Sequence, residues 1–172
     1  MDRVLVVTGA SRGIGAAIAL VPARDGYRVC INYNRSRSAA EALAAKIARD
    51  GGHAITVQAD VGGPPAVGML VRTVDEQLGP LNALVNNAGG YAGVNRVDEM
   101  RPEQLIETFA TNIFSYFYCS REAVRRMSTG RRQRCRGLPS RSRGPPTPTK
   151  RRTRLRWMCC GRWGRSRTRN KQ

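Results

Sequence analysis

The chain has 172 residues and a net charge of +18, but residues 1–127 hold 14 Lys/Arg and all 12 Asp/Glu, whereas residues 128–172 hold 16 Lys/Arg and no acid. Only the aliphatic, near-neutral first part can build a core, so we expect a globular domain over 1–127 and a disordered basic tail over 128–172. Five irregularly spaced cysteines and no run of 18 apolar residues argue against a disulfide framework, a metal site and a membrane span, which favours a cytoplasmic protein.

Strand and helix patterns alternate along the first part. Residues 3–8 form a short apolar run typical of a strand covered on both faces, and an alanine-rich helical pattern follows from Ile14 to about Asp25. The alternation continues with strands at 29–33, 54–58 and 81–85 and helices at 39–50 and 66–78. This order predicts an α/β fold with a doubly wound, Rossmann-like parallel sheet.

Two of the helical patterns carry further expectations. Pro22 lies inside the first helix, where proline costs about 3 kcal/mol, so we expect that helix to kink or end early. From Pro102 to about Met127, apolar side chains at near-helical spacing predict one long helix. These side chains are Leu105, Ile106, Phe109, Ile113, Phe117 and Val124.

A glycine-rich turn joins the first strand to the first helix. Gly9, Gly13 and Gly15 allow a tight turn and a close approach of the backbone to a ligand. The free N–H groups of the following helix would then face a pyrophosphate. Glycine-rich turns also occur for structural reasons alone, so the turn indicates a dinucleotide site only together with other motifs.

Four motifs in order resemble the short-chain dehydrogenase/reductase family, including its 3-oxoacyl-carrier-protein reductases and sugar dehydrogenases. Thr8-Gly9-Ala10-Ser11-Arg12-Gly13-Ile14-Gly15 is similar to the family's TGxxxGxG turn, and Asp60-Val61 resembles its adenine-contacting pair. Asn86-Asn87-Ala88-Gly89 resembles the NNAG motif that supports the sheet and lines the ribose, and Asn112 resembles the catalytic asparagine that holds a water of the proton relay. Taken singly, each aspartate or asparagine is equally explained as a loop cap, a turn residue or a polar helix residue.

The end of the second strand bears on the choice of cofactor. An acidic side chain there would accept the ribose hydroxyls of NAD and repel a 2′-phosphate, but the segment 32–36 contains none. Arg12 and Arg35 can instead bind that phosphate, because a guanidinium matches its geometry, whereas Arg37 is equally explained as a solvated loop residue. We therefore expect NADP rather than NAD. The expected cofactor-binding residues are Thr8, Gly9, Ser11, Arg12, Gly13, Ile14, Gly15, Asn34, Arg35, Asp60, Val61, Asn86, Asn87, Ala88 and Gly89.

The resemblance covers residues 1 to about 127 and implies strand order 3-2-1-4 and hydride transfer between NADP(H) and a small carbonyl or alcohol substrate. Family members continue with a fifth strand, a catalytic serine and a YxxxK motif, whereas Tyr118 is the last tyrosine here. Without that tyrosine to exchange a proton with the substrate, we expect this chain to be inactive. Intact relatives are homo-oligomers, so an uncovered fourth strand and long helix should make this chain prone to aggregation.

The tail over 128–172 allows two interpretations. Its abundance of Arg, Pro, Ser, Trp and Cys is typical of a GC-rich gene read out of frame. Alternatively, Trp157 and Trp163 among arginines could bind nucleic acid by stacking on bases and neutralising phosphates. A nucleic-acid-binding protein would spread basic residues over its folded part, and since residues 1–127 are near neutral, the oxidoreductase interpretation is favoured.

Overall fold

The structure is a computed structural model that describes residues 3–91, 93 and 96–136. Within them, four parallel strands form one sheet in the order β3-β2-β1-β4, which confirms the predicted Rossmann-like fold. The strands are β1 (Arg3–Val7), β2 (Tyr27–Tyr33), β3 (His53–Gln58) and β4 (Leu81–Val85). Strand β1 pairs with β2 on one side and with β4 on the other. Val6, for example, lies opposite Cys30 of β2 and Leu84 of β4.

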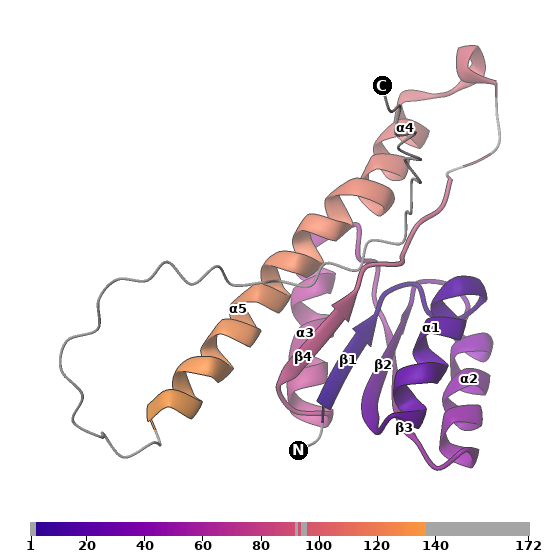
Figure 1. Cartoon of the computed structure of the whole chain (residues 1–172). Helices are drawn as coiled ribbons and strands as arrows, with labels where there is room; N and C mark the ends of the chain where they lie inside the picture. Colours follow the sequence, from indigo (N-terminus) through magenta and orange to yellow (C-terminus); the bar gives the residue numbers. More distant parts are fainter. Residues whose placement is uncertain (1–2, 92, 94–95, 137–172) are drawn as a thin grey trace, which may run out of the picture.

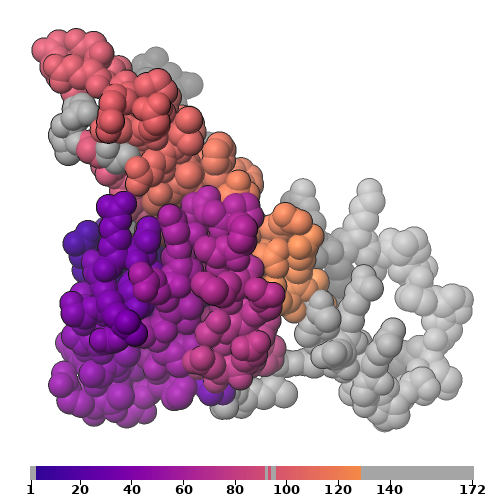
Figure 2. All heavy atoms as spheres, turned by 180° about the vertical axis from the view of Figure 1, so that it is seen from behind, coloured from indigo at the N-terminus to yellow at the C-terminus, as the bar shows by residue number. Residues whose placement is uncertain are grey.

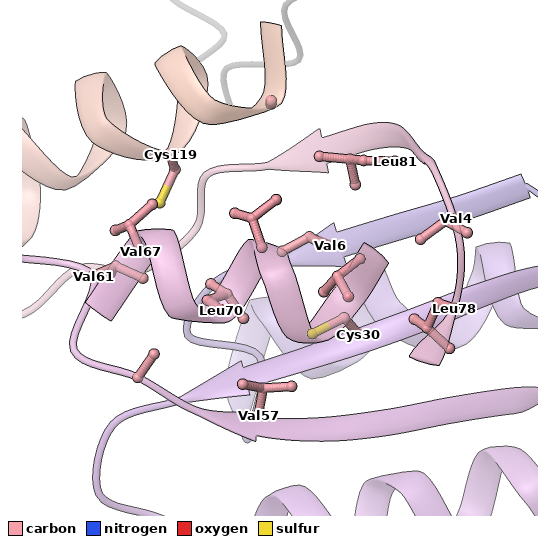
Figure 3. Close-up of a cluster of buried hydrophobic side chains, with 14 of the residues drawn as sticks. Val4, Val6, Cys30, Val57, Val61, Val67, Leu70, Leu78, Leu81 and Cys119 are labelled. Carbon is pink, nitrogen blue, oxygen red and sulfur yellow. The ribbon is translucent and has the colours of Figure 1, made fainter. Parts of the chain in front are cut away.

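Helices cover both faces of the sheet (Figure 1). Helices α1 (Gly13–Arg24) and α2 (Arg37–Arg49) pack on one face, and α3 (Pro64–Gln77) and α5 (Ser115–Arg136) pack on the other. Side chains alternate along β1 because a strand has a period of two, so Leu5 and Val7 face α1 and α2. Val4 and Val6 face the opposite layer, where Figure 3 shows them in the cluster around α3.

The first helix does not end early at Pro22, so that part of the expectation is wrong. Helix α1 runs through Pro22 to Arg24, and the N–H of Asp25 still donates to the carbonyl oxygen of Val21 at 3.3 Å. Proline removes only its own N–H donor, and here it stands in the last turn of the helix, so few bonds depend on it. Buried Ala19 and Ala23 hold that turn against the sheet.

The predicted long helix is divided and extends further than expected. Helix α4 (Pro102–Phe109) is followed by a wider, π-helical segment, Ala110–Phe114, and then by α5, which reaches Arg136 and not Met127. Arginine and glutamine occupy most of 131–136 and are good helix formers, which explains the extension. The division at residue 127 stays a prediction, and the tail beyond Arg136, with Trp157 and Trp163, lies outside the described residues.

Much of the apolar surface of α4 and α5 is exposed. Neither α4 nor the π-helical segment contains a buried residue, and α4 projects beyond the body of the domain (Figure 2). The exposed apolar side chains are Leu105, Ile106, Phe109, Ile113, Phe114, Phe117 and Val124. Strand β4 has no outer neighbour within the described residues. No helix in this described part is long and apolar enough to cross a membrane.

Candidate functional site

A groove of about 230 Å³ lies at the carboxyl ends of the strands. In a doubly wound sheet this is where ligands bind, because the connections on either side of β1 lead to opposite faces and leave a crevice. The groove is lined by residues that follow β1, β2, β3 and β4 and by residues from α4 and the π-helical segment. They are Gly9, Ser11, Arg12, Asn32, Tyr33, Asn34, Arg35, Ser36, Ala59, Asp60, Val61, Ala88, Gly89, Gly90, Tyr91, Glu107, Thr108 and Thr111.

The glycine turn is packed directly against the segment that follows β4. Gly9 has φ +61°, and a Cβ there would lie 2.8 Å from the Cα of Ala88. A Cβ on Gly15 would lie 2.8 Å from the carbonyl oxygen of Gly9 and would also meet Nδ2 of Asn87. These two positions therefore require glycine, because any side chain would push the turn away from the segment that follows β4.

Thr8 and Asn87 fasten the turn by hydrogen bonds. The Thr8 hydroxyl oxygen accepts the N–H groups of Asn87 and Ala88 at 2.9 and 3.0 Å, and the hydroxyl donates to the carbonyl oxygen of Val85. Asn87 Nδ2 donates to the carbonyl oxygens of Thr8 and Gly9 at 2.9 and 3.1 Å. Neither side chain lines the groove, so the two residues position the groove from behind it.

Asn32 completes this arrangement and was missed among the candidate residues. Its side chain is 1% exposed, its Oδ1 accepts the N–H of Gly9, and its Nδ2 donates to the carbonyl oxygens of Val57 and Ala59. One buried amide thus joins the ends of β1, β2 and β3. A polar residue at an otherwise apolar strand end is the signal that could have identified it.

The predicted adenine-contacting pair has one exposed and one buried member. Asp60 lies in the groove, and its Oδ1 accepts the N–H of Gly62 at 2.9 Å, which shapes the loop after β3. Val61 is 4% exposed and packs in the core beside α3. A ligand in the groove can therefore reach the carboxylate of Asp60, while the buried side chain of Val61 anchors the loop.

Two further predicted asparagines, Asn86 and Asn112, lie beside the groove and do not line it. Asn86 Nδ2 donates to the hydroxyl of Ser120 on α5 at 3.0 Å, while its buried Oδ1 has no partner within the described part of the chain. Asn112 holds Gly90 by two bonds, accepting its N–H at 3.0 Å and donating to its carbonyl oxygen at 2.6 Å. Asn112 thereby ties the π-helical segment to the rim of the groove.

Three arginines near the groove differ in their ion pairs. Arg12 lines the groove, is exposed and forms no ion pair with another described residue. Arg35 lies 3.4 Å from a carboxylate oxygen of Glu107 on α4. Arg37 points to Glu41 on its own helix at 2.9 Å and does not line the groove. The structure therefore places Arg12 and Arg35, but not Arg37, where an anionic ligand would meet them.

Cys30 and Cys119 do not line the groove. Cys30 and Cys119 are free thiols in the core between the sheet, α3 and α5 (Figure 3). Burial raises the pKa of each thiol to about 12, so both remain protonated and unreactive near neutral pH. Within the described residues no three His, Cys, Asp or Glu side chains gather as metal ligands.

The sixteen predicted site residues divide into two groups. Those that line the groove are Gly9, Ser11, Arg12, Asn34, Arg35, Asp60, Val61, Ala88 and Gly89. Those behind or beside it are Thr8, Gly13, Ile14, Gly15, Asn86, Asn87 and Asn112. Glu107, Thr108 and Thr111 also line the groove, and no local sequence signal marks them, because they reach it only through the packing of a distant helix.

Comparison with known proteins agrees with this geometry. The family model for short chain dehydrogenase matches residues 3–136. The chain is 40% identical over 125 residues to the uncharacterized oxidoreductase YgfF of Escherichia coli, covering 73% of this chain and 51% of that protein. It is 37% identical over 127 residues to the 3-oxoacyl-[acyl-carrier-protein] reductase FabG of Staphylococcus aureus, covering 74% and 51%. The chain thus spans about half the length of the curated relatives it matches.

Solved structures show the same correspondence. A short chain dehydrogenase from Burkholderia cenocepacia, crystallised in complex with NADP, superposes with a TM-score of 0.68 at 40% identity, covering 73% of this chain and 51% of that one. A short-chain dehydrogenase/reductase from Serratia marcescens gives a TM-score of 0.69 at 37% identity, with the same two coverages. The described fold is therefore half of a known architecture.

Proposed function

The chain belongs to the short chain dehydrogenase family, and on that premise we propose that its groove binds a nicotinamide dinucleotide, with NADP preferred over NAD. In the complete protein we propose an oxidoreductase that acts on a small carbonyl or alcohol substrate. The cofactor would supply or take up the hydride, and the protein would bind, orient and shield it. The names of the relatives, an oxidoreductase and a reductase, support this reaction class.

The observation that carries the proposal is the pair of arginines in a groove that follows an acid-free strand end. Arg12 and Arg35 line the groove, and the segment 32–36, which includes Arg35, contains no carboxylate. A 2′-phosphate can accept paired N–H donors from a guanidinium, whereas an acidic residue at this position would select the unphosphorylated ribose. The charge at the end of β2 therefore fits NADP.

The turn residues fit the pyrophosphate of the same ligand. Helix α1 begins at Gly13 without a side-chain cap and without an acid in its first turn, so its first N–H groups remain available. Gly9 has no Cβ and so lets the turn pack directly against Ala88, and Thr8, Asn32 and Asn87 hold the turn in place. We expect the turn to orient the dinucleotide and to keep its backbone conformation when the dinucleotide binds.

We further propose that the 172-residue chain binds the dinucleotide without catalysing turnover. None of its three lysines follows a tyrosine at four residues, so the proton-donating pair of the family is missing from this sequence. Asn112 remains a proposed member of the proton relay in the complete protein, where its hold on Gly90 would position it. A reducing, cytoplasmic setting is part of the proposal and is supported by the free thiols of Cys30 and Cys119.

The test is a calorimetric titration of the 172-residue chain with NADPH and with NADH. We expect NADPH to bind more tightly, and Arg12→Gln and Arg35→Gln each to weaken NADPH binding about ten- to hundredfold, because each removes a charge-assisted hydrogen bond worth about 1.5–3 kcal/mol. NADH binding should stay unchanged. Arg37→Gln is the matched control, because Arg37 lies outside the groove. Equal binding of the two dinucleotides by all variants would contradict the NADP preference.

A further inference from the structure

One carboxylate stands opposite the arginine proposed to bind the ribose phosphate. Glu107 lies on α4 and lines the groove, and its Oε1 is 3.4 Å from Nη2 of Arg35, which follows β2. The two residues are 72 positions apart in the chain, so only the packing of α4 over the groove brings them together. Both side chains are more than half exposed, at 84% for Arg35 and 58% for Glu107.

We infer that Glu107 competes with the ribose 2′-phosphate for Arg35 and so sets how strongly the protein prefers NADP over NAD. This inference rests on the proposed function and adds to it a specificity-determining residue on a different element. A carboxylate and a phosphate are alternative partners for one guanidinium, because both offer paired oxygens in its plane. Before the phosphate can take both donors, the contact with Glu107 must be released.

The geometry indicates that this release costs little. The contact is a single one at 3.4 Å between exposed groups, and such surface pairs change an equilibrium constant by no more than about fivefold. Helix α4 has no buried residue, so the position of Glu107 is not enforced by core packing. The carboxylate therefore lowers the affinity for the phosphate without abolishing it.

The other groups of the groove do not share this role. Asp60 is the second acid that lines the groove, but its Oδ1 accepts the N–H of Gly62, and it forms no ion pair with a described arginine. Arg12 has no carboxylate partner in the described part of the chain. The competition thus concerns Arg35 alone, and Arg12 remains the uncontested phosphate ligand.

The experiment compares Glu107→Gln with wild type in titrations with NADPH and with NADH. We expect the variant to bind NADPH about two- to fivefold more tightly, because it loses the contact that competes for Arg35, and to bind NADH unchanged. Glu103→Gln is the matched control, since Glu103 lies one turn earlier on α4, is exposed and does not line the groove. In the background of Arg35→Gln, the substitution of Glu107 should bring no gain, because the competition passes through Arg35.

Each contrary outcome overturns the inference in a recognisable way. Weaker NADPH binding by Glu107→Gln would mean that Glu107 orients Arg35 toward the phosphate. Weaker NADH binding would mean that the carboxylate accepts the ribose hydroxyls. Glu107→Gln could instead raise the affinity for both dinucleotides equally, or raise it as much in Arg35→Gln as in wild type. Either result would mean that Glu107 acts only as a nonspecific negative charge. If wild type binds neither dinucleotide, both the proposed function and this inference are wrong. If wild type binds NADPH and Glu107→Gln binds it with the same affinity, only the inference is wrong.

Discussion

The two walls of the groove are built on different principles. The strand wall, made by the segments that follow β1 to β4, is held by buried hydrogen bonds of Thr8 and Asn32, each 1% exposed. The helix wall, made by α4 and the π-helical segment, has no buried residue and meets the strand wall through Asn112 and the exposed pair of Arg35 and Glu107. Rigid positioning therefore comes from the strand wall, while the helix wall adjusts what the groove accepts.

The largest expected effect comes from breaking the strand wall at Gly15. Gly15→Ala would place a Cβ 2.8 Å from the carbonyl oxygen of Gly9, so the turn must shift. We expect the free energy of unfolding to fall by about 2–3 kcal/mol and dinucleotide binding to be lost. Urea unfolding measures the first and calorimetric titration the second. Gly68→Ala on α3 is the control, because a Cβ there meets nothing within 4 Å, and it should stabilise the helix by about 0.5–1 kcal/mol. Similar stability of the two variants would contradict this account.

The next effect removes the hydroxyl that joins the turn to the segment after β4. Thr8→Val keeps the shape of the side chain but leaves the N–H groups of Asn87 and Ala88 without their acceptor, and we expect a destabilisation of about 2 kcal/mol. The control is Thr73→Val on α3, whose hydroxyl donates only to the carbonyl oxygen one turn earlier. If both variants unfold at the same urea concentration, the buried bonds of Thr8 do not hold the strand wall.

A smaller, pH-dependent effect concerns α5, which follows the helix wall and packs on α3. Arg126 on α5 contacts Asp75 on α3 at 2.6 Å and Glu122 at 2.8 Å. Partial burial raises the pKa of Glu122, but the hydrogen bond to Arg126 and the charges of Arg125 and Arg126 outweigh it, so the pKa lies below its usual value. A carboxylate with a lowered pKa in the folded state stabilises above its unfolded pKa and loses that contribution as pH falls through the folded pKa.

Glu122→Gln should therefore lower stability near neutral pH by on the order of 0.5–1 kcal/mol and remove part of the acid sensitivity. The measurement is urea unfolding of both proteins between neutral pH and the pH where carboxylates titrate. Glu76→Gln is the control, because Glu76 is exposed and forms no ion pair with another described residue. Identical pH profiles of wild type and Glu122→Gln would show that the ion pair of Glu122 with Arg126 does not contribute to stability.

The smallest effect on stability is expected at the exposed apolar surface of α5. Phe117 is 71% exposed, so Phe117→Ser should change the free energy of unfolding by less than about 0.5 kcal/mol while reducing aggregation. Light scattering at increasing protein concentration measures the aggregation, and Phe117→Leu is the control that keeps the surface apolar. If Phe117→Ser aggregates as much as wild type, another surface causes the aggregation. The unpaired edge of β4 is then the next surface to test.

The strand wall was largely predictable from the sequence, and the helix wall was not. The glycine turn at residues 8–15, the pair Asp60-Val61 and the segment 86–89 each follow a recognisable strand, so their meeting at one edge follows from parallel topology. Glu107 carries no such mark, because it is one of several exposed acids on an amphipathic helix and reaches Arg35 only through the course of the chain after β4.

Errors at the helix ends have local physical causes. The pattern of apolar residues predicted a helix to about Met127, but helical backbone continues to Arg136, since arginine sustains a helix without an apolar stripe. The π-helical widening at Ala110–Phe114 was not foreseen, because periodicity over a long window averages out one irregular turn. Pro22 was expected to kink α1 or end it early, yet the helix continues past it to Arg24, where Ala19 and Ala23 pack in the core.

The sequence by itself determined the order of strands and helices, the parallel sheet and the glycine turn, because apolar periodicity and the absence of Cβ atoms act within a few residues of the chain. Only the tertiary structure decided that Asn32 would join three strand ends and that Glu107 would meet Arg35. Hydrogen bonds and ion pairs need two groups at a fixed distance, and for residues far apart in sequence that distance is set by the packing of whole elements.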